Sequence, residues 1–131
     1  MEAGATMRID PQADRRRLVM RFALSTNGPA FIAAMQGWMD QHPEAVGYDW
    51  LYDMRIYHGT VSHDDVTHFA RAYAAIADAR DTGRYAIFVS PDPGLPLWIR
   101  ACALHFPRRI LTVVRTMAEA EKLLRRDSSA K

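Results

Sequence analysis

Hydrophobic and polar residues alternate along the first part of the chain. In residues 17–24, Leu18, Met20, Phe22 and Leu24 are separated by smaller or charged residues, which is the period-two pattern of a β-strand. Residues 7–9 are a shorter strand candidate, and residues 10–14 between the two have turn composition. This part of the chain therefore predicts an opening antiparallel hairpin.

Residues 48–56 predict a third strand, rich in aromatic side chains. Trp50, Tyr52, Met54 and Ile56 would share one face, whereas Asp49, Leu51, Asp53 and Arg55 would share the other. In the segments 85–89 and 110–114 every residue except Thr112 is apolar. Such runs are typical of parallel strands that are covered on both faces.

Segments with apolar residues at helical spacing alternate with these strands. They predict helices from residues 25–29 to about Gln41, from Ser62 onward, from the proline-rich loop 91–96 to about Phe106, and from Thr116 onward. Ser62 with Asp65 and Thr116 with Glu119 have the spacing of N-terminal caps. The order β-β-α-β-α-β-α-β-α predicts an α/β fold with a single mixed sheet. Right-handed crossovers would make its later strands parallel, with helices covering them.

Length and charge narrow the possible functions. A chain of 131 residues predicts one domain, with an ordered core at about residues 7–124 and flexible ends at 1–6 and 127–131. The 17 basic residues nearly balance 15 acidic ones, so the basic excess of a nucleic-acid-binding protein is missing. The arginine clusters at 15–17, 108–109 and 125–126 border predicted elements, where we expect solvated charge.

The single cysteine, Cys102, lies in an apolar run and fits a small core residue in a reducing compartment. The first residues lack the apolar region of a signal peptide, and no apolar run approaches the roughly 20 residues of a membrane span. We therefore expect a cytoplasmic protein without a membrane span.

Taken together, several segments resemble the STAS (SpoIIAA-like) domain family. They are Leu51-Tyr-Asp-Met-Arg55, the capped helix from Ser62, the strands at 85–89 and 110–114, and Ala118-Glu-Ala-Glu-Lys-Leu-Leu124. The resemblance covers about residues 7–124, rests on element order more than on an exact motif, and is better to a divergent bacterial branch than to classical regulators.

That resemblance implies a compact module that binds a partner protein or a small ligand. Classical members carry a phosphorylatable Ser or Thr where the helix after the third strand begins, within an Asp-Ser-Ser-Gly-like sequence. This chain has His58-Gly-Thr-Val-Ser-His63 there instead, with Ser62 as the nearest counterpart and Thr60 as the second. A phosphate at this helix end would be stabilised by free N–H groups, but a simple helix cap explains Ser62 better.

Asp53 at the end of the third strand is the next candidate. A phosphoacceptor of the receiver-domain type would need an acidic pair after the first parallel strand and a lysine after the last, and the chain has Ser25-Thr-Asn27 and Arg115-Thr116 there. A structural ion pair with Arg55, or a group that organises the following loop, is the better interpretation.

No motif specifies a metal, a cofactor or a reaction. His63 and His68 are five residues apart, so a helix does not align them as ligands. The loop 91–96 has one glycine and no lysine, unlike a P-loop, and no nucleophile elbow occurs. The chain therefore predicts no cofactor and favours a non-enzymatic protein.

Two functional hypotheses remain. The first is a regulatory or interaction module that binds a partner protein, or itself as a homodimer, through the loop 57–63 and the following helix start. The alternative is a carrier or sensor of a small apolar molecule or lipid, in a pocket between sheet and helices near Trp98, Trp50 and Tyr52.

Overall fold

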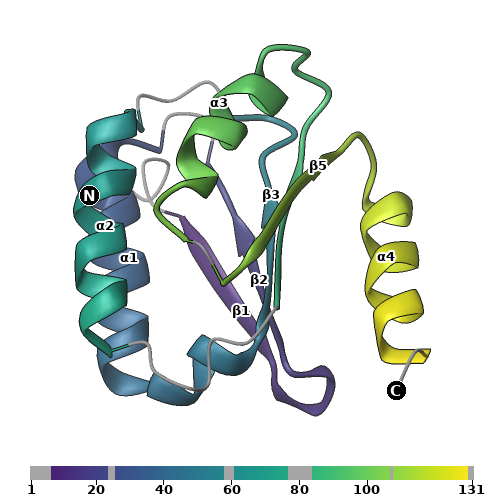
Figure 1. Ribbon diagram of the computed structural model, residues 1–131, viewed down its shortest axis with the longest axis horizontal. Helices are drawn as coiled ribbons and strands as arrows, with labels where there is room; N and C mark the ends of the chain where they lie inside the picture. The colour runs from purple at the N-terminus through teal and green to yellow at the C-terminus, as the bar shows by residue number, and fades with distance from the viewer. Residues whose placement is uncertain (1–6, 24–25, 58–60, 77–83, 107, 130–131) are drawn as a thin grey trace.

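One five-stranded sheet forms the centre of the protein, with its strands in the order β1-β2-β3-β4-β5 (Figure 1). The computed structural model describes residues 7–23, 26–57, 61–76, 84–106 and 108–129. The strands are β1 (Arg8–Gln12), β2 (Arg17–Arg21), β3 (Asp49–Asp53), β4 (Tyr85–Val89) and β5 (Ile110–Val114). β1 pairs antiparallel with β2, and every later pairing is parallel. The predicted α/β fold with one mixed sheet is confirmed.

Three helices cover one face of the sheet and the last covers the other (Figure 1). They are α1 (Gly28–Gln41), α2 (His63–Ile76), α3 (Leu95–Ala103) and α4 (Met117–Ser129), with short 3₁₀ helices η2 (Ala13–Arg15) and η3 (Pro43–Gly47). Consecutive parallel strands are neighbours here, so right-handed crossovers place α1, α2 and α3 on the same side. No strand follows α4, so no crossover connection fixes the side on which it packs. It covers the opposite face of the sheet.

Local sequence signals account for the helix starts. The side chain of Asn27 accepts the N–H of Ala30 at 2.9 Å, and Pro29 stands at the start of α1. At α4, the N–H of Glu119 bonds the hydroxyl of Thr116 at 3.1 Å, while the Glu119 carboxylate accepts the N–H of Thr116 at 3.1 Å. This reciprocal pair is the predicted capping box.

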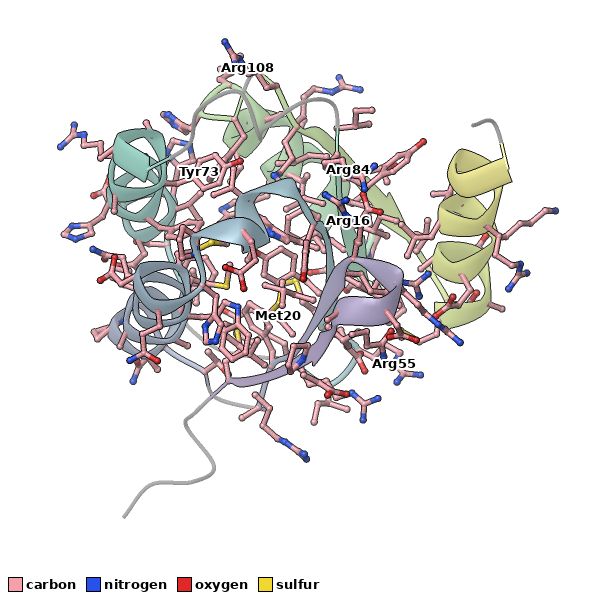
Figure 2. The ribbon with its side chains drawn as sticks, turned by 90° about the horizontal axis from the view of Figure 1, so that it is seen from below. Arg16, Met20, Arg55, Tyr73, Arg84 and Arg108 are labelled. Carbon is pink, nitrogen blue, oxygen red and sulfur yellow. The ribbon has the colours of Figure 1, made fainter. Side chains whose placement is uncertain are left out.

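Two apolar cores result from the alternation of side chains along the strands. The larger lies beneath α1, α2 and α3, and the smaller lies between the sheet and α4, where Leu51 and Ile87 meet Ala120 and Leu124. Figure 2 views the molecule from below and shows Met20 enclosed between sheet and helices. The different faces predicted for Trp50 and Leu51 are confirmed by their places in the two cores.

Some element boundaries differ from those expected. β1 extends to Gln12, and its Pro11 is tolerated because β1 is an edge strand. β3 ends at Asp53, so Ile56, expected on the core face, is 62% exposed. α3 ends at Ala103 rather than near Phe106, and α4 continues past Leu124 to Ser129. Residues 1–6, expected to be flexible, lie outside the described residues.

Two arginines assigned to solvated clusters are buried. Arg17 donates two bonds of 2.8 Å to the carboxylate of Glu121 on α4, and Arg109 lies beneath the helices, 5% exposed. The expectation was wrong for both because their partners are distant in sequence, at separations that no local pattern reveals.

Within the described part of the chain, none of the helices has both the length and the apolar character needed to cross a bilayer.

Candidate functional site

An apolar pocket lies between the sheet and the helices that cover its larger core. Its volume is about 100 Å³. The wall is formed by β3, β4 and β5, by α1, α2 and α3, and by the loops beside them. The lining residues are Phe22, Phe31, Trp50, Tyr52, Met54, Tyr57, Val61, Val66, Phe69, Ala86, Phe88, Leu95, Trp98, Ile99, Cys102, Phe106, Arg109 and Leu111.

The pocket has a buried floor and a partly exposed rim. Trp50, Tyr52 and Ala86 form part of the floor, and each is at most 3% exposed. Tyr57, Val61, Leu95, Trp98, Phe88 and Leu111 are the lining residues of intermediate exposure. Trp98, Trp50 and Tyr52, the three residues proposed from the sequence for a pocket, therefore lie in the wall of the same cavity.

Aromatic rings give the pocket much of its shape. The rings of Tyr52 and Phe88, on neighbouring strands, are stacked with centroids 4.8 Å apart and planes 7° from parallel. Phe22 meets Tyr57 edge-on at 4.9 Å, and Phe31 from α1 meets Phe69 from α2 edge-on at 5.6 Å. Such pairs hold their rings in defined orientations, which favours a preformed cavity.

Several polar atoms in the wall are already bonded within the protein. The indole N–H of Trp50 donates to the carbonyl of Ala45 at 3.0 Å. The hydroxyl oxygen of Tyr57 accepts the N–H of Val61 at 2.7 Å, which links the end of the β3 segment to the approach to α2. The Tyr52 hydroxyl lies 3.9 Å from the sulfur of Met35. These polar atoms already have partners within the protein, which leaves fewer of them to bind a polar ligand.

Arg109 is the charged residue of the pocket wall, and its guanidinium holds neighbouring backbone in place. It donates to the carbonyl oxygens of Tyr48 at 2.8 Å and Tyr85 at 3.1 Å, to that of Val46, and to the hydroxyl of Tyr73 at 3.3 Å. Carbonyl dipoles thus help to stabilise the cation, which meets the requirement that a buried charge be hydrogen-bonded.

Burial favours the neutral forms of two tyrosines and a cysteine in the pocket wall. It raises the pKa of the Tyr52 hydroxyl and, with the nearby carboxylate of Asp65, that of Tyr57. Burial also raises the pKa of the Cys102 thiol to about 11. A thiol in that state is a poor nucleophile at neutral pH. The described lining residues include no Asp, Glu or His.

Ser62 lies outside this pocket wall and caps α2. Its hydroxyl accepts the N–H of Asp65 at 3.2 Å and donates to the Asp65 carboxylate at 2.9 Å, and the same carboxylate accepts the N–H of Ser62 at 2.8 Å. The predicted cap is confirmed. Thr60, the second phosphorylation candidate, lies outside the described residues.

Asp53 forms the predicted ion pair with Arg55. The Nε and Nη2 atoms of Arg55 donate to the two carboxylate oxygens of Asp53, each at 2.8 Å. These bonds to Arg55 lower the pKa of Asp53 against the opposing effect of burial. The ion pair therefore gives Asp53 and Arg55 a structural role. Figure 2 shows Arg55 near the edge of the molecule.

Histidines near the start of α2 do not form a metal site with other ligands. The rings of His63 and His105 lie 5.1 Å apart, and the Nε2 atom of His105 lies 3.4 Å from the hydroxyl of Thr67. Among the residues that the structure describes, no group of three or more His, Cys, Asp or Glu is placed to hold a metal ion.

Comparisons of the chain with family models, with curated proteins and with solved structures gave no match.

Sequence reasoning identified part of the pocket and missed the rest. Arg109 and Phe88 were missed, because their lining role depends on how β4 and β5 pack against the helices. A usable signal was present in residues 95–106: Leu95, Ile99, Cys102 and Phe106 recur at helical spacing, and all line the pocket.

Proposed function

We propose that the protein binds a small, uncharged apolar molecule in the pocket between the sheet and α1, α2 and α3. The observation that carries the proposal is an apolar cavity in whose wall Trp50, Tyr57 and Arg109 already use their polar atoms in hydrogen bonds within the protein. Such a wall offers dispersion and ring contacts to a ligand and little else, so it selects against charge.

The energetic argument supports the same conclusion. An enclosed, empty apolar cavity lowers stability by about 24 cal/mol for each Å³, so about 2 kcal/mol is the upper bound for the 100 Å³ of this pocket, whose rim is partly exposed. A domain that needed only stability would gain by filling it. A ligand with apolar groups would recover that free energy on binding.

The pocket volume suggests the size of the ligand. An engineered cavity of roughly 150 Å³ stays dry and binds benzene. The cavity here is somewhat smaller, at about 100 Å³, but its rim is partly exposed. It suits a single ring or a short hydrocarbon chain, with any larger part of the ligand extending past Trp98 and Leu95.

The interaction-module hypothesis draws less support from the geometry. It was placed on the loop 57–63 and the following helix start, and within that region the side chain of Ser62 is occupied by its cap with Asp65. The resemblance to the STAS family stays a prediction.

Toluene tests the proposal as a probe of suitable size. We expect the melting temperature of the wild-type protein to rise with toluene concentration, because a ligand that binds only the folded state stabilises it. Ala86→Leu should abolish this shift, because it adds bulk at the floor of the pocket, where Ala86 is 2% exposed. Ala33→Leu adds the same atoms on the exposed side of α1 and serves as the control.

Equal toluene responses in Ala86→Leu and in wild type would contradict the proposal, as would no response in the wild type. Trp98→Ala provides a second variant at the rim, in case Ala86→Leu does not fold. Native mass spectrometry of gently purified protein would then show whether a molecule is retained and give its mass.

A further inference from the structure

The outward side of α3 is apolar, although α3 lies at the surface of the molecule. Leu97 is 73% exposed and Leu104 is 81% exposed. The exposed Ala101 lies between them at helical spacing, and Leu104 keeps helical backbone angles, so the three side chains form one stripe. Surface helices normally present polar residues to water, so this stripe is a candidate contact surface.

Positive charge accompanies the stripe. Arg100 is exposed within it, one turn from both leucines, and Arg108 is exposed just beyond its end. Figure 2 shows Arg108 projecting outward on the side of the molecule where α3 lies. Between residues 91 and 110, Asp92 is the sole acidic residue, and one of its carboxylate oxygens accepts the N–H of Gly94 at 2.9 Å. Apolar side chains flanked by arginine suit a surface of anionic lipid headgroups over acyl chains.

The same helix forms part of the pocket on its inner side. Leu95, Trp98 and Ile99 line the cavity, while Leu97 and Leu104 face away from it. One helix therefore separates the outside of the protein from the candidate ligand site. An apolar ligand is scarce in water and concentrated in a bilayer, so a contact with lipid would place the pocket rim beside the source of its ligand.

We propose that α3 docks on an anionic lipid surface, with Leu97 and Leu104 among the acyl chains and Arg100 at the headgroups. The exchange of ligand with the bilayer rests on the proposed function, whereas the docking itself does not. A second copy of the chain suits this face less well, because a two-fold contact centred on the stripe would bring Arg100 close to its own symmetry mate.

Sedimentation of the full chain with vesicles tests the docking. We expect the protein to sediment with phosphatidylcholine vesicles that contain phosphatidylglycerol, less with phosphatidylcholine alone, and less as NaCl is added. Leu97→Ser should weaken partitioning by about tenfold, and adding Leu104→Ser should weaken it by about tenfold again. Arg100→Gln should weaken it roughly fivefold. Lys122→Gln, which removes an exposed cation from α4 on the other face, should have little effect.

The toluene response separates this proposal from the proposed function. The leucine variants should keep the wild-type shift in melting temperature, which shows that fold and pocket are intact. Docking is overturned if the wild type stays in the supernatant with anionic vesicles or if the double leucine variant sediments like wild type. A wild-type dimer that the leucine changes dissociate, without vesicle binding, would also overturn it and assign the face to self-association. Vesicle binding without any toluene response would support docking and contradict the proposed binding of an apolar ligand in the pocket.

Discussion

The guanidinium carbon of Arg109 lies 3.7 Å from the ring centroid of Trp50, directly over the indole. Arg109 immediately precedes β5 and Trp50 lies on β3, so this cation–π contact spans β4 between them. The same guanidinium bonds the carbonyl of Tyr48, just before β3. Arg109 thus connects the start of β5 to the segment that leads into β3, at one end of the pocket.

Replacement of Arg109 should destabilise the fold strongly. Arg109→Met leaves the carbonyls of Val46, Tyr48 and Tyr85 without this donor, and we expect a loss of about 3–5 kcal/mol in the free energy of unfolding. Arg109→Lys should lose less, because it keeps the charge but not the planar arrangement of donors. Urea unfolding measures both, with Arg100→Lys at an exposed position of α3 as the control. A stable Arg109→Met would mean that water or rearranged backbone satisfies these carbonyls.

Gly28 should not tolerate a side chain. The first turn of α1 meets the start of α2 there, and a Cβ on Gly28 would overlap the carboxylate of Asp65. Gly28→Ala must displace that carboxylate and break its cap with Ser62, so we expect a loss of about 1–3 kcal/mol by urea unfolding.

Gly37 is the matched control on the same helix. A Cβ there meets nothing within 4 Å, so Gly37→Ala should stabilise the protein by about 0.5–1 kcal/mol through helix propensity. If Gly28→Ala were equally stabilising, the contact between Gly28 and Asp65 would not persist in solution.

The Asp53–Arg55 pair should contribute pH-dependent stability. Its bonds lower the folded-state pKa of Asp53 below the unfolded value of about 3.9. The contribution is therefore present above the unfolded pKa and lost as the pH falls through the folded one. Asp53→Asn should cost on the order of 1 kcal/mol at pH 7, because the Arg55 side chain is 50% exposed. The difference from wild type should shrink in unfolding measurements below about pH 3.

The thiol of Cys102 should react slowly while the protein is folded. Its pKa of about 11 and its 2% exposure leave little thiolate accessible near pH 8. We expect slow labelling by a chromogenic disulfide in buffer and prompt, complete labelling in urea, with the native rate increasing as the pH rises toward the thiol pKa. Gly28→Ala should accelerate the reaction if labelling proceeds through unfolding. Fast labelling of the native wild type would show instead that the pocket opens widely.

The pocket should discriminate against charge. Hexanol and hexanoate each have six carbon atoms, but binding strips water from the carboxylate, and the polar atoms of Trp50, Tyr57 and Arg109 in the wall already have hydrogen-bond partners. At pH 7 we expect hexanol to raise the melting temperature more than hexanoate, with at least roughly tenfold tighter binding. Tighter binding of hexanoate would indicate that Arg109 serves as a counter-charge and would require a different ligand class.

The sequence by itself determined the secondary structure elements and the class of fold. The caps at Ser62 and Thr116 involve atoms three residues apart, and the alternation in β2 and the apolar run of β4 reflect burial on one face or two. These are local signals, so they can be identified without knowledge of the tertiary structure.

Only the tertiary structure decided the burial of the two arginines and the form of the pocket. Arg17 meets Glu121 at a separation of 104 residues, and Arg109 meets Val46 at a separation of 63. Trp50, Tyr52 and Trp98 were recognisable as aromatic residues of the core, but a cavity is what remains after side chains from several elements have packed. Its volume depends on all of them together, and no single segment of sequence contains that information.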